Sequence, residues 1–311
     1  MKNRPLSASV ASNVPAPALR DHAAHRGALA AIFDYVDLTK PRLNLLVVVT
    51  SAGGFYLASS GTRPLLTMIA ASIGTALVAC GAAVLNQVLE RDTDALMERT
   101  RMRPLPAARV AADDATIFGI ALASAGLALL YSAANLLAVL LALATILIYR
   151  LIYTPMKRRS PLATFVGAVP GALPALIGWT AAAGTASAGG WALFAIVFLW
   201  QIPHFMAIAW MFRDDYRRAG FPMLSVVDPT GSRAGREAVV WTVALLPVSV
   251  SPTLVGISGT AYAWVAGVLG IALLALAIRF ASTRSDASAR ALFFGSITYL
   301  PLLWAAMMLD R

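Results

Sequence analysis

Three side chains that offer oxygen atoms recur at four-residue intervals: Asn86, Glu90 and Asp94. On a helix this spacing puts them on one slowly turning face. Two carboxylates and an amide suit a hard cation such as Mg²⁺, which keeps several waters and takes further oxygen ligands from phosphate groups. The spacing therefore predicts a divalent cation site that works together with a phosphate-bearing ligand.

Arginines follow the acidic stretch directly, and guanidinium groups suit phosphate or carboxylate oxygens. They are Arg99, Arg101 and Arg103. Asp92 is predicted to point away from the acidic face if the helix continues past it. The alternative interpretation is a solvated helix end held by ion pairs. Asn86 argues against it, because a polar residue at or just inside a membrane surface is costly and is commonly functional.

A second candidate element is basic. Tyr153 and Lys157 are four residues apart, and Arg158 and Arg159 follow. The Thr154–Pro155 pair predicts a shaped turn that would direct Tyr153 and Lys157 toward a shared site. A Lys/Arg cluster beside a membrane span is also an ordinary topological anchor, and this alternative stays open.

The third candidate stretch combines an imidazole with two carboxylates. His204 lies in an apolar run, and Asp214 and Asp215 follow it. On a continuous helix His204 and Asp215 would differ by about 20° and lie about 16 Å apart along one face. Asp214 could simply pair with Arg218 four residues on. His204 is either a residue satisfied by helix packing or an axial ligand to the iron of a metalloporphyrin, which imidazole suits.

The elements that carry these residues are membrane helices. Of the 311 residues, 59% are hydrophobic and only 13% are charged, whereas soluble domains carry about 25% charged residues. With a mean hydropathy of +0.73, this excludes a soluble globular enzyme and a disordered or fibrous chain. We predict an all-α membrane protein with about nine transmembrane helices. Their approximate ranges are 43–60, 66–89, 115–132, 135–152, 163–182, 191–211, 237–256, 261–280 and 291–309.

The charges test this assignment. With nine spans, 23 of the 25 Lys and Arg residues fall on the side of the N-terminus, which the positive-inside rule makes cytoplasmic. Of the 15 acids, 14 lie on the same side, the exception being Asp310. One face of the protein is therefore expected to carry its chemistry. The net charge of +10 follows from the inner loops and predicts no nucleic-acid partner. The single Cys80 excludes a disulfide framework.

Two regions are predicted. Residues 1–32 form a cytoplasmic N-terminal tail without fixed structure, and residues 33–311 form the membrane-embedded domain. The tail has no apolar core and is not a secretory signal peptide. A bacterial tail and a mitochondrial transit segment are both open, so the expected location is the bacterial inner membrane, with the mitochondrial inner membrane as the alternative.

These elements together resemble the intramembrane prenyltransferases of the UbiA superfamily. Four segments are similar to the branch of this family that farnesylates heme: NQVLERDTDALMERTRMRPLP, YTPMKRRSP, FVGAVPGALPALIGW and HFMAIAWMFRDDYRRAGFPMLSV. The resemblance covers residues 33–309, and the first and last segments together are highly specific. It implies a helical bundle around a central cavity that opens to the cytoplasmic side and to lipid.

The resemblance also implies substrates and roles. Farnesyl diphosphate would bind through Mg²⁺, and protoheme IX (heme B) would be the acceptor substrate rather than a prosthetic group. The matching residues are Asn86, Glu90 and Asp94 in the first metal motif, Asp214 and Asp215 in the second acidic loop, Tyr153, Lys157, Arg99, Arg103 and Arg158 at the diphosphate, and His204 in the heme branch's HF phrase. Glu90 stands where Asp is common, and the second loop lacks the spaced aspartates of other branches.

The expected reaction joins the farnesyl carbon to a heme vinyl group, with water adding to the resulting cation. A heme A synthase or a terminal oxidase assembly is an expected partner. Two alternatives remain: a sibling prenyltransferase with a quinone-precursor or chlorophyll-type acceptor, and a membrane transporter. A transporter predicts charges near the bilayer midplane, whereas nearly all acids here are predicted at one rim.

Overall fold

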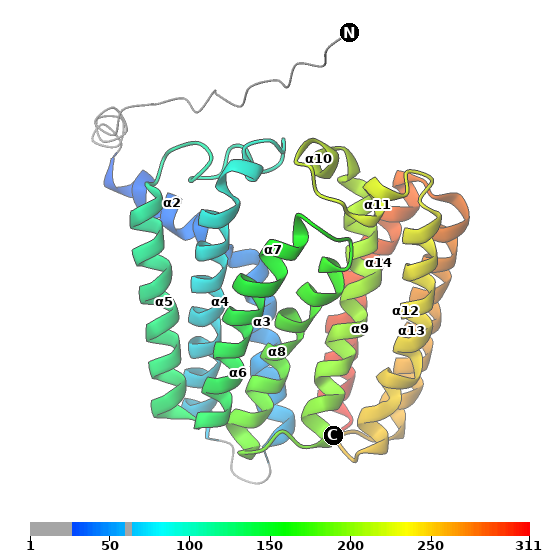
Figure 1. Cartoon of the computed structure of the whole chain (residues 1–311). Helices are drawn as coiled ribbons and strands as arrows, with labels where there is room; N and C mark the ends of the chain where they lie inside the picture. The colour runs from blue at the N-terminus through cyan, green and yellow to red at the C-terminus, as the bar shows by residue number, and fades with distance from the viewer. Residues whose placement is uncertain (1–26, 60–63) are drawn as a thin grey trace.

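The regular structure described for this chain is helical. A computed structural model describes residues 27–59 and 64–311, and its long helices stand side by side as one bundle (Figure 1). The helices are α2 Ala28–Leu38, α3 Pro41–Ala58, α4 Leu65–Asp94, α5 Ala112–Ala133, α6 Leu136–Leu147, the π-helix η1 Ile148–Tyr153, α7 Thr154–Lys157, α8 Ala163–Ala183, α9 Ala188–Met211, α10 Arg213–Arg218, α11 Leu224–Val227, α12 Ser232–Leu254, α13 Thr260–Thr283 and α14 Asp286–Leu309. The predicted all-α class is confirmed.

Eight helical segments of the described chain are long and apolar enough to cross a membrane, with α6, η1 and α7 counting as one. The 18-residue α3 also runs through the bundle (Figure 1). It buries Asn44, Thr50 and Ser51, and these polar residues lower its apolar content. With α3, the described chain agrees with the predicted nine spans.

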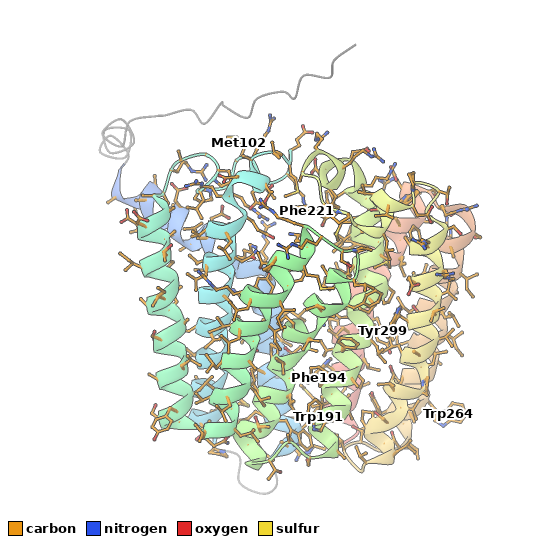
Figure 2. All side chains as sticks on the ribbon, viewed as in Figure 1. Met102, Trp191, Phe194, Phe221, Trp264 and Tyr299 are labelled. Atoms are coloured by element: carbon orange, nitrogen blue, oxygen red, sulfur yellow. The ribbon has the colours of Figure 1, made fainter. Side chains whose placement is uncertain are left out.

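The two ends of the bundle differ in character. The loop at residues 95–111, α7 and α10 lie at one end (Figure 1), which we call the charged end. Trp191 and Trp264 are exposed near the opposite end (Figure 2), as is typical of aromatic residues at a membrane–water interface.

The N-terminal boundary differs from the prediction. Residues 1–26 of the predicted tail lie outside the described residues, but α2 already begins at Ala28, before the predicted boundary at residue 33. The Asp34 carboxylate accepts a hydrogen bond from Arg109 Nε at 2.7 Å. The rings of Tyr35 and Phe118 meet edge to face, with centroids 5.1 Å apart. These contacts fix α2 against α5 and the loop that precedes it.

The length of α4 places the first acidic motif. Its 30 residues span about 45 Å at 1.5 Å per residue, whereas the hydrocarbon core of a bilayer is about 30 Å thick. Its last turns, which carry Asn86 to Asp94, therefore stand at the charged end.

Small residues let α4 lie close to α5. A Cβ added at Gly81 would lie 2.6 Å from the Gly119 carbonyl oxygen, and one at Gly126 would lie 2.6 Å from the Gly74 carbonyl oxygen. Two glycines seven residues apart on each helix thus bring the backbones together, the packing that membrane helices favour. This contact fixes the lateral position of the acidic motif.

The predicted turn at Thr154–Pro155 is wrong. The helix continues through it by widening into the π-helix η1 and then re-forming as α7. Pro155 has no N–H for the ordinary helical bond, and Thr154 Oγ1 lies 2.8 Å from the Tyr149 carbonyl oxygen. Lys157 therefore ends a long helical segment.

The predicted common helical face of His204 and Asp215 is also wrong, because the helix is not continuous. It ends at Met211, and α10 begins at Arg213. Between them Phe212 has φ −111° and ψ 24°, outside the ordinary helical region. This break redirects the two aspartates of α10.

Candidate active site

The first acidic motif is buried at the charged end. Asn86, Glu90 and Asp94 are 4%, 6% and 1% exposed. Asn86 Nδ2 donates to Glu90 Oε2 at 2.8 Å, so these two side chains meet on one face of α4. Buried carboxylates need cationic or hydrogen-bonding partners.

The partners of Asn86 and Glu90 come from the fourth span. Lys157 Nζ lies 3.0 Å from Glu90 Oε1, and Thr154 Oγ1 donates to Asn86 Oδ1 at 2.7 Å. We call these four side chains the Asn86–Glu90–Lys157 network. It joins the predicted acidic and basic elements across the bundle, although 67 residues separate Lys157 from Glu90.

Aromatic rings enclose the ammonium group of Lys157. Nζ lies 6.0 Å from the centre of the Tyr153 ring and 4.6 Å from that of Phe221, within cation–π range. Phe221 belongs to the second half of the chain, and Figure 2 shows it at the charged end. Gly220, with φ +70°, allows the turn that brings Phe221 back after α10. The Tyr153 ring packs on Gly167 of α8.

The third member of the motif pairs with the loop that follows α4. Arg103 Nη1 lies 2.8 Å from Asp94 Oδ2, and Thr100 Oγ1 donates to the Asp94 backbone carbonyl at 2.7 Å. The loop thus folds back over the end of its own helix. Asp92 is exposed and pairs with Arg91, pointing away from the motif as predicted.

The second acidic pair contacts this loop. Asp215 accepts hydrogen bonds from the backbone N–H groups of Glu98 at 3.2 Å and Arg99 at 3.5 Å, and it also pairs with Arg218. Burial raises the pKa of Asp215, but the Glu98 and Arg99 amides and Arg218 outweigh it and lower the pKa below the ordinary value. Asp215 therefore attaches the first loop to α10.

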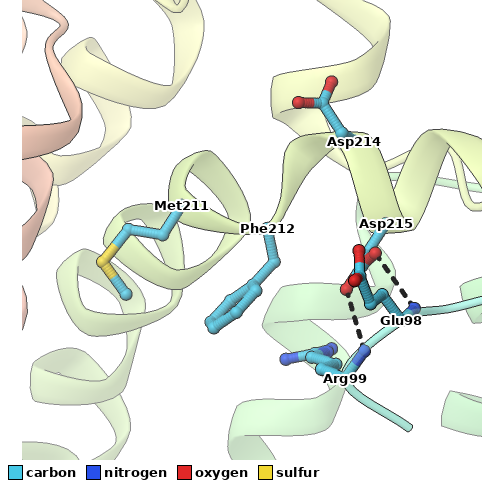
Figure 3. Close-up of a pocket in the computed structure, with 6 residues that line it drawn as sticks. All are labelled: Glu98, Arg99, Met211, Phe212, Asp214 and Asp215. Atoms are coloured by element: carbon cyan, nitrogen blue, oxygen red, sulfur yellow. Dashed lines mark hydrogen bonds between the residues drawn. The ribbon is translucent and has the colours of Figure 1, made fainter. Parts of the chain in front are cut away.

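Asp214 points away from Asp215 (Figure 3). It is exposed and pairs with Arg217 at 2.7 Å. The predicted pairing of Asp214 with Arg218 is wrong, because each aspartate of the short α10 pairs with the arginine three residues on.

A pocket of about 320 Å³ opens where the loop meets α9 and α10 (Figure 3). Its lining residues are Glu98, Arg99, Met211, Phe212, Asp214 and Asp215. The Arg99 guanidinium lies 4.6 Å from the ring centre of Phe212 and 4.9 Å from that of Tyr216, and it donates to the Tyr216 hydroxyl at 2.8 Å. Arg99 thus faces the second acidic loop, whereas Arg103 faces the first motif. Arg158 is exposed at the C-cap of α7.

Lys40 is a further candidate site residue, and it is not among those predicted from the sequence. It precedes α3 in a left-handed conformation, φ 51° and ψ 60°, which is strained for a residue other than glycine and is often kept at functional sites. Burial and the repulsion of Arg103 lower the pKa of Lys40 to about 8, while Glu90 and Asp94 oppose that shift. Lys40 therefore belongs to the charge cluster of the first motif. A Lys-Pro pair at the start of a span is the signal that could have revealed it.

His204 lies apart from the charged groups, inside α9. Its Nδ1 is 2.8 Å from Ser296 Oγ on α14. Its ring stacks with Trp200, at 5.2 Å and 19°, and with Phe293, at 5.0 Å and 21°. Seven residues before the end of α9, it is about 10 Å below that helix end. The imidazole thus lies at the depth of the apolar side chains.

The donors of the first motif fit Mg²⁺ that arrives with a phosphate-bearing ligand. In residues 27–59 and 64–311, no three His, Cys, Asp or Glu side chains gather closely enough to hold a metal alone. Mg²⁺ commonly takes only one or two protein carboxylates, with waters and substrate phosphates completing its shell. Asn86, Glu90 and Asp94 offer such a set. Metal ligation by Asp214 and Asp215 stays a prediction.

Known proteins resemble this chain over most of its length. The profile of the UbiA prenyltransferase family matches residues 46–300. Protoheme IX farnesyltransferase of Solibacter usitatus is 44% identical over 287 residues, 89% of this chain and 98% of that protein. The protein of the same name from Anaeromyxobacter dehalogenans is 47% identical over 287 residues, 91% of this chain and 95% of that protein.

Solved structures share the fold at low sequence identity. A digeranylgeranylglyceryl phosphate synthase superposes with a TM-score of 0.75 at 16% identity, covering 90% of this chain and 98% of that one. A UbiA homolog from Archaeoglobus fulgidus, bound to GPP and Mg²⁺, has a TM-score of 0.64 at 17% identity, covering 88% and 99%.

Proposed function

This chain belongs to the UbiA prenyltransferase family, and from that premise we propose that it transfers the farnesyl group of farnesyl diphosphate to a vinyl group of protoheme IX. Water adds in the same reaction, so the products are heme O and diphosphate. The curated relatives named protoheme IX farnesyltransferase support this acceptor. The observation that carries the proposal is the buried Asn86–Glu90–Lys157 network beside the Asp94–Arg103 pair.

The charge cluster suits a diphosphate leaving group. Asn86, Glu90 and Asp94 would hold Mg²⁺, which would neutralise the diphosphate as the allylic C–O bond breaks. Lys157 and Arg103 pair with the two carboxylates now, and they would turn to the phosphate oxygens once the metal takes those carboxylates. The GPP and Mg²⁺ bound by the Archaeoglobus homolog support this arrangement.

The acceptor would lie deeper in the bundle than the diphosphate. His204 is half-buried among the rings of Trp200 and Phe293, surroundings that suit a flat apolar macrocycle, and its imidazole would bind the heme iron. The charged end would face the cytoplasm of a bacterial inner membrane. A heme A synthase or an oxidase assembly would receive the product.

Mass spectrometry of extracted hemes tests the proposal. Membranes containing the protein are incubated with heme B, farnesyl diphosphate and Mg²⁺, with and without EDTA. We expect a heme that has gained one farnesyl group and one hydroxyl group from water, absent with EDTA. Consumption of farnesyl diphosphate only with other aromatic acceptors would refute heme as the acceptor, and no consumption under any condition would refute prenyl transfer.

Two variants separate the two substrates. Asp94→Ala should lose most of the activity while heme binding is retained; full turnover would refute the metal assignment. His204→Ala should alter the absorption spectrum of bound heme. An unchanged spectrum and an unchanged rate would show that His204 has only a packing role.

A further inference from the structure

We propose that Ser296 is a positioning residue: it fixes His204 as the tautomer protonated at Nδ1 and leaves Nε2 free to bind the iron of the acceptor. This inference rests on the proposed function and extends it to a side chain on another helix.

The hydrogen bonds of Ser296 determine the tautomer. Ser296 Oγ lies 2.7 Å from the Phe293 carbonyl oxygen and 2.8 Å from His204 Nδ1. The hydroxyl has one proton, and a carbonyl oxygen can only accept. Because the Ser296 hydroxyl donates its proton to the Phe293 carbonyl oxygen, its contact with His204 is a hydrogen bond only if His204 Nδ1–H donates to Ser296 Oγ. Neutral imidazole carries one N–H, so Nε2 keeps its lone pair.

The same residue of α14 also holds the neighbouring ring. Trp200 Nε1 donates to the Ser296 carbonyl at 2.7 Å. Trp200 and His204 are four residues apart on α9, while Phe293 and Ser296 are three apart on α14, so each pair faces the other helix. The imidazole is thus restrained by two stacked rings and one hydrogen bond. Such restraint gives Nε2 a defined direction.

The hydrogen bond between His204 and the Ser296 hydroxyl suits a histidine that binds the heme iron reversibly. A metal-binding histidine donates its other N–H to an oxygen, which orients the ring and raises its basicity. A neutral serine hydroxyl raises that basicity less than a carboxylate would. The imidazole therefore remains a moderate ligand, as reversible binding of an acceptor substrate requires. Loss of such an outer partner typically weakens metal binding about 10–100-fold.

Heme binding by Ser296→Ala tests the inference. The substitution removes the acceptor of Nδ1–H but keeps the backbone carbonyl that holds Trp200. The matched control is Ser249→Ala, since Ser249 is equally buried and its hydroxyl contacts Tyr299, also on α14, at 2.6 Å. For Ser296→Ala we expect affinity for heme B to fall about 10–100-fold and the reduction potential of the bound heme to rise. The KM for heme should rise, and the KM for farnesyl diphosphate should stay unchanged.

A direct measurement of the tautomer needs no substrate. The chain has three histidines, so His204 can be assigned in ¹⁵N-histidine-labelled protein by comparison with His204→Ala. We expect Nδ1 protonated and Nε2 bare. The opposite tautomer, or equal effects of Ser296→Ala and Ser249→Ala on heme, would overturn the inference. If the protein binds heme as expected but forms no heme O, the proposed reaction fails while the role of Ser296 stands.

Discussion

Replacing Gly167 by alanine will show whether Tyr153 must lie where α8 now places it. An added Cβ would lie 2.6 Å from Tyr153 Cε2 and 2.8 Å from Cδ2. Carbon atoms in contact prefer about 3.5–4.0 Å, so the ring must retreat by about 1 Å. Tyr153 adjoins Lys157, and the displacement would pass to the ammonium group.

The expected effect is a loss of rate with little loss of stability. A misplacement of about 1 Å can cost about 100-fold in rate. Alanine is favoured over glycine within a helix by about 0.5–1 kcal/mol, and this gain offsets part of the strain. Heme O formation and thermal unfolding are measured together on Gly167→Ala and on Gly267→Ala. At Gly267 the added Cβ would meet no described atom within 4 Å apart from its chain neighbours and the backbone of its own helix. If both variants retain the same activity, the position of Tyr153 does not matter for the reaction and the reasoning fails.

Three further substitutions probe the charged end. Glu90→Gln leaves Lys157 buried without its carboxylate, so we expect at least 10-fold lower activity and a higher Mg²⁺ requirement, measured by Mg²⁺ titration of the initial rate; an unchanged titration would contradict this. Lys40→Gly relieves the strain of the left-handed backbone conformation, so the Tm should rise. The same substitution removes a cation, so the KM for farnesyl diphosphate should increase. An unchanged KM would exclude Lys40 from the site. Folding lowers the pKa of Asp215. Ionised Asp215 therefore stabilises the folded protein at pH values above its unfolded-state pKa of about 4, and this stabilisation is lost as the pH falls through the lower folded-state pKa. Asp215→Asn should flatten that acidic part of a Tm–pH curve, and an identical curve would refute the assignment.

Regular helical spacing is the part of the site that the sequence made predictable. Asn86, Glu90 and Asp94 lie on the continuous helix α4, so their separation in sequence determines their relative direction. The apolar runs likewise predict the membrane helices, because each must be long enough to span a bilayer. Both predictions depend only on neighbours within one helix.

Contacts between helices were not predictable in the same way. The break at Phe212 invalidated the helical geometry that connected His204 with Asp215. Phe221 reaches Lys157 only because the chain turns back after α10, and an isolated phenylalanine in a loop gives no signal of such a contact. Ser296 is one of many hydroxyl residues in apolar helices, and only the packing of α14 on α9 assigns it a partner.

The two ion pairs of the first acidic motif also determine which species can enter. Glu90 with Lys157 and Asp94 with Arg103 balance their charges, and Lys40 beside them adds one further cation, so the cluster has no negative excess to attract a free metal ion. A free metal ion would have to displace two cations, and a free diphosphate would have to displace two carboxylates. A metal–diphosphate complex can replace both kinds of partner at once. Its metal binds the two carboxylates in place of Lys157 and Arg103, and its phosphate oxygens accept the two displaced cations. This exchange of partners thus favours entry of the metal and the prenyl diphosphate as one complex.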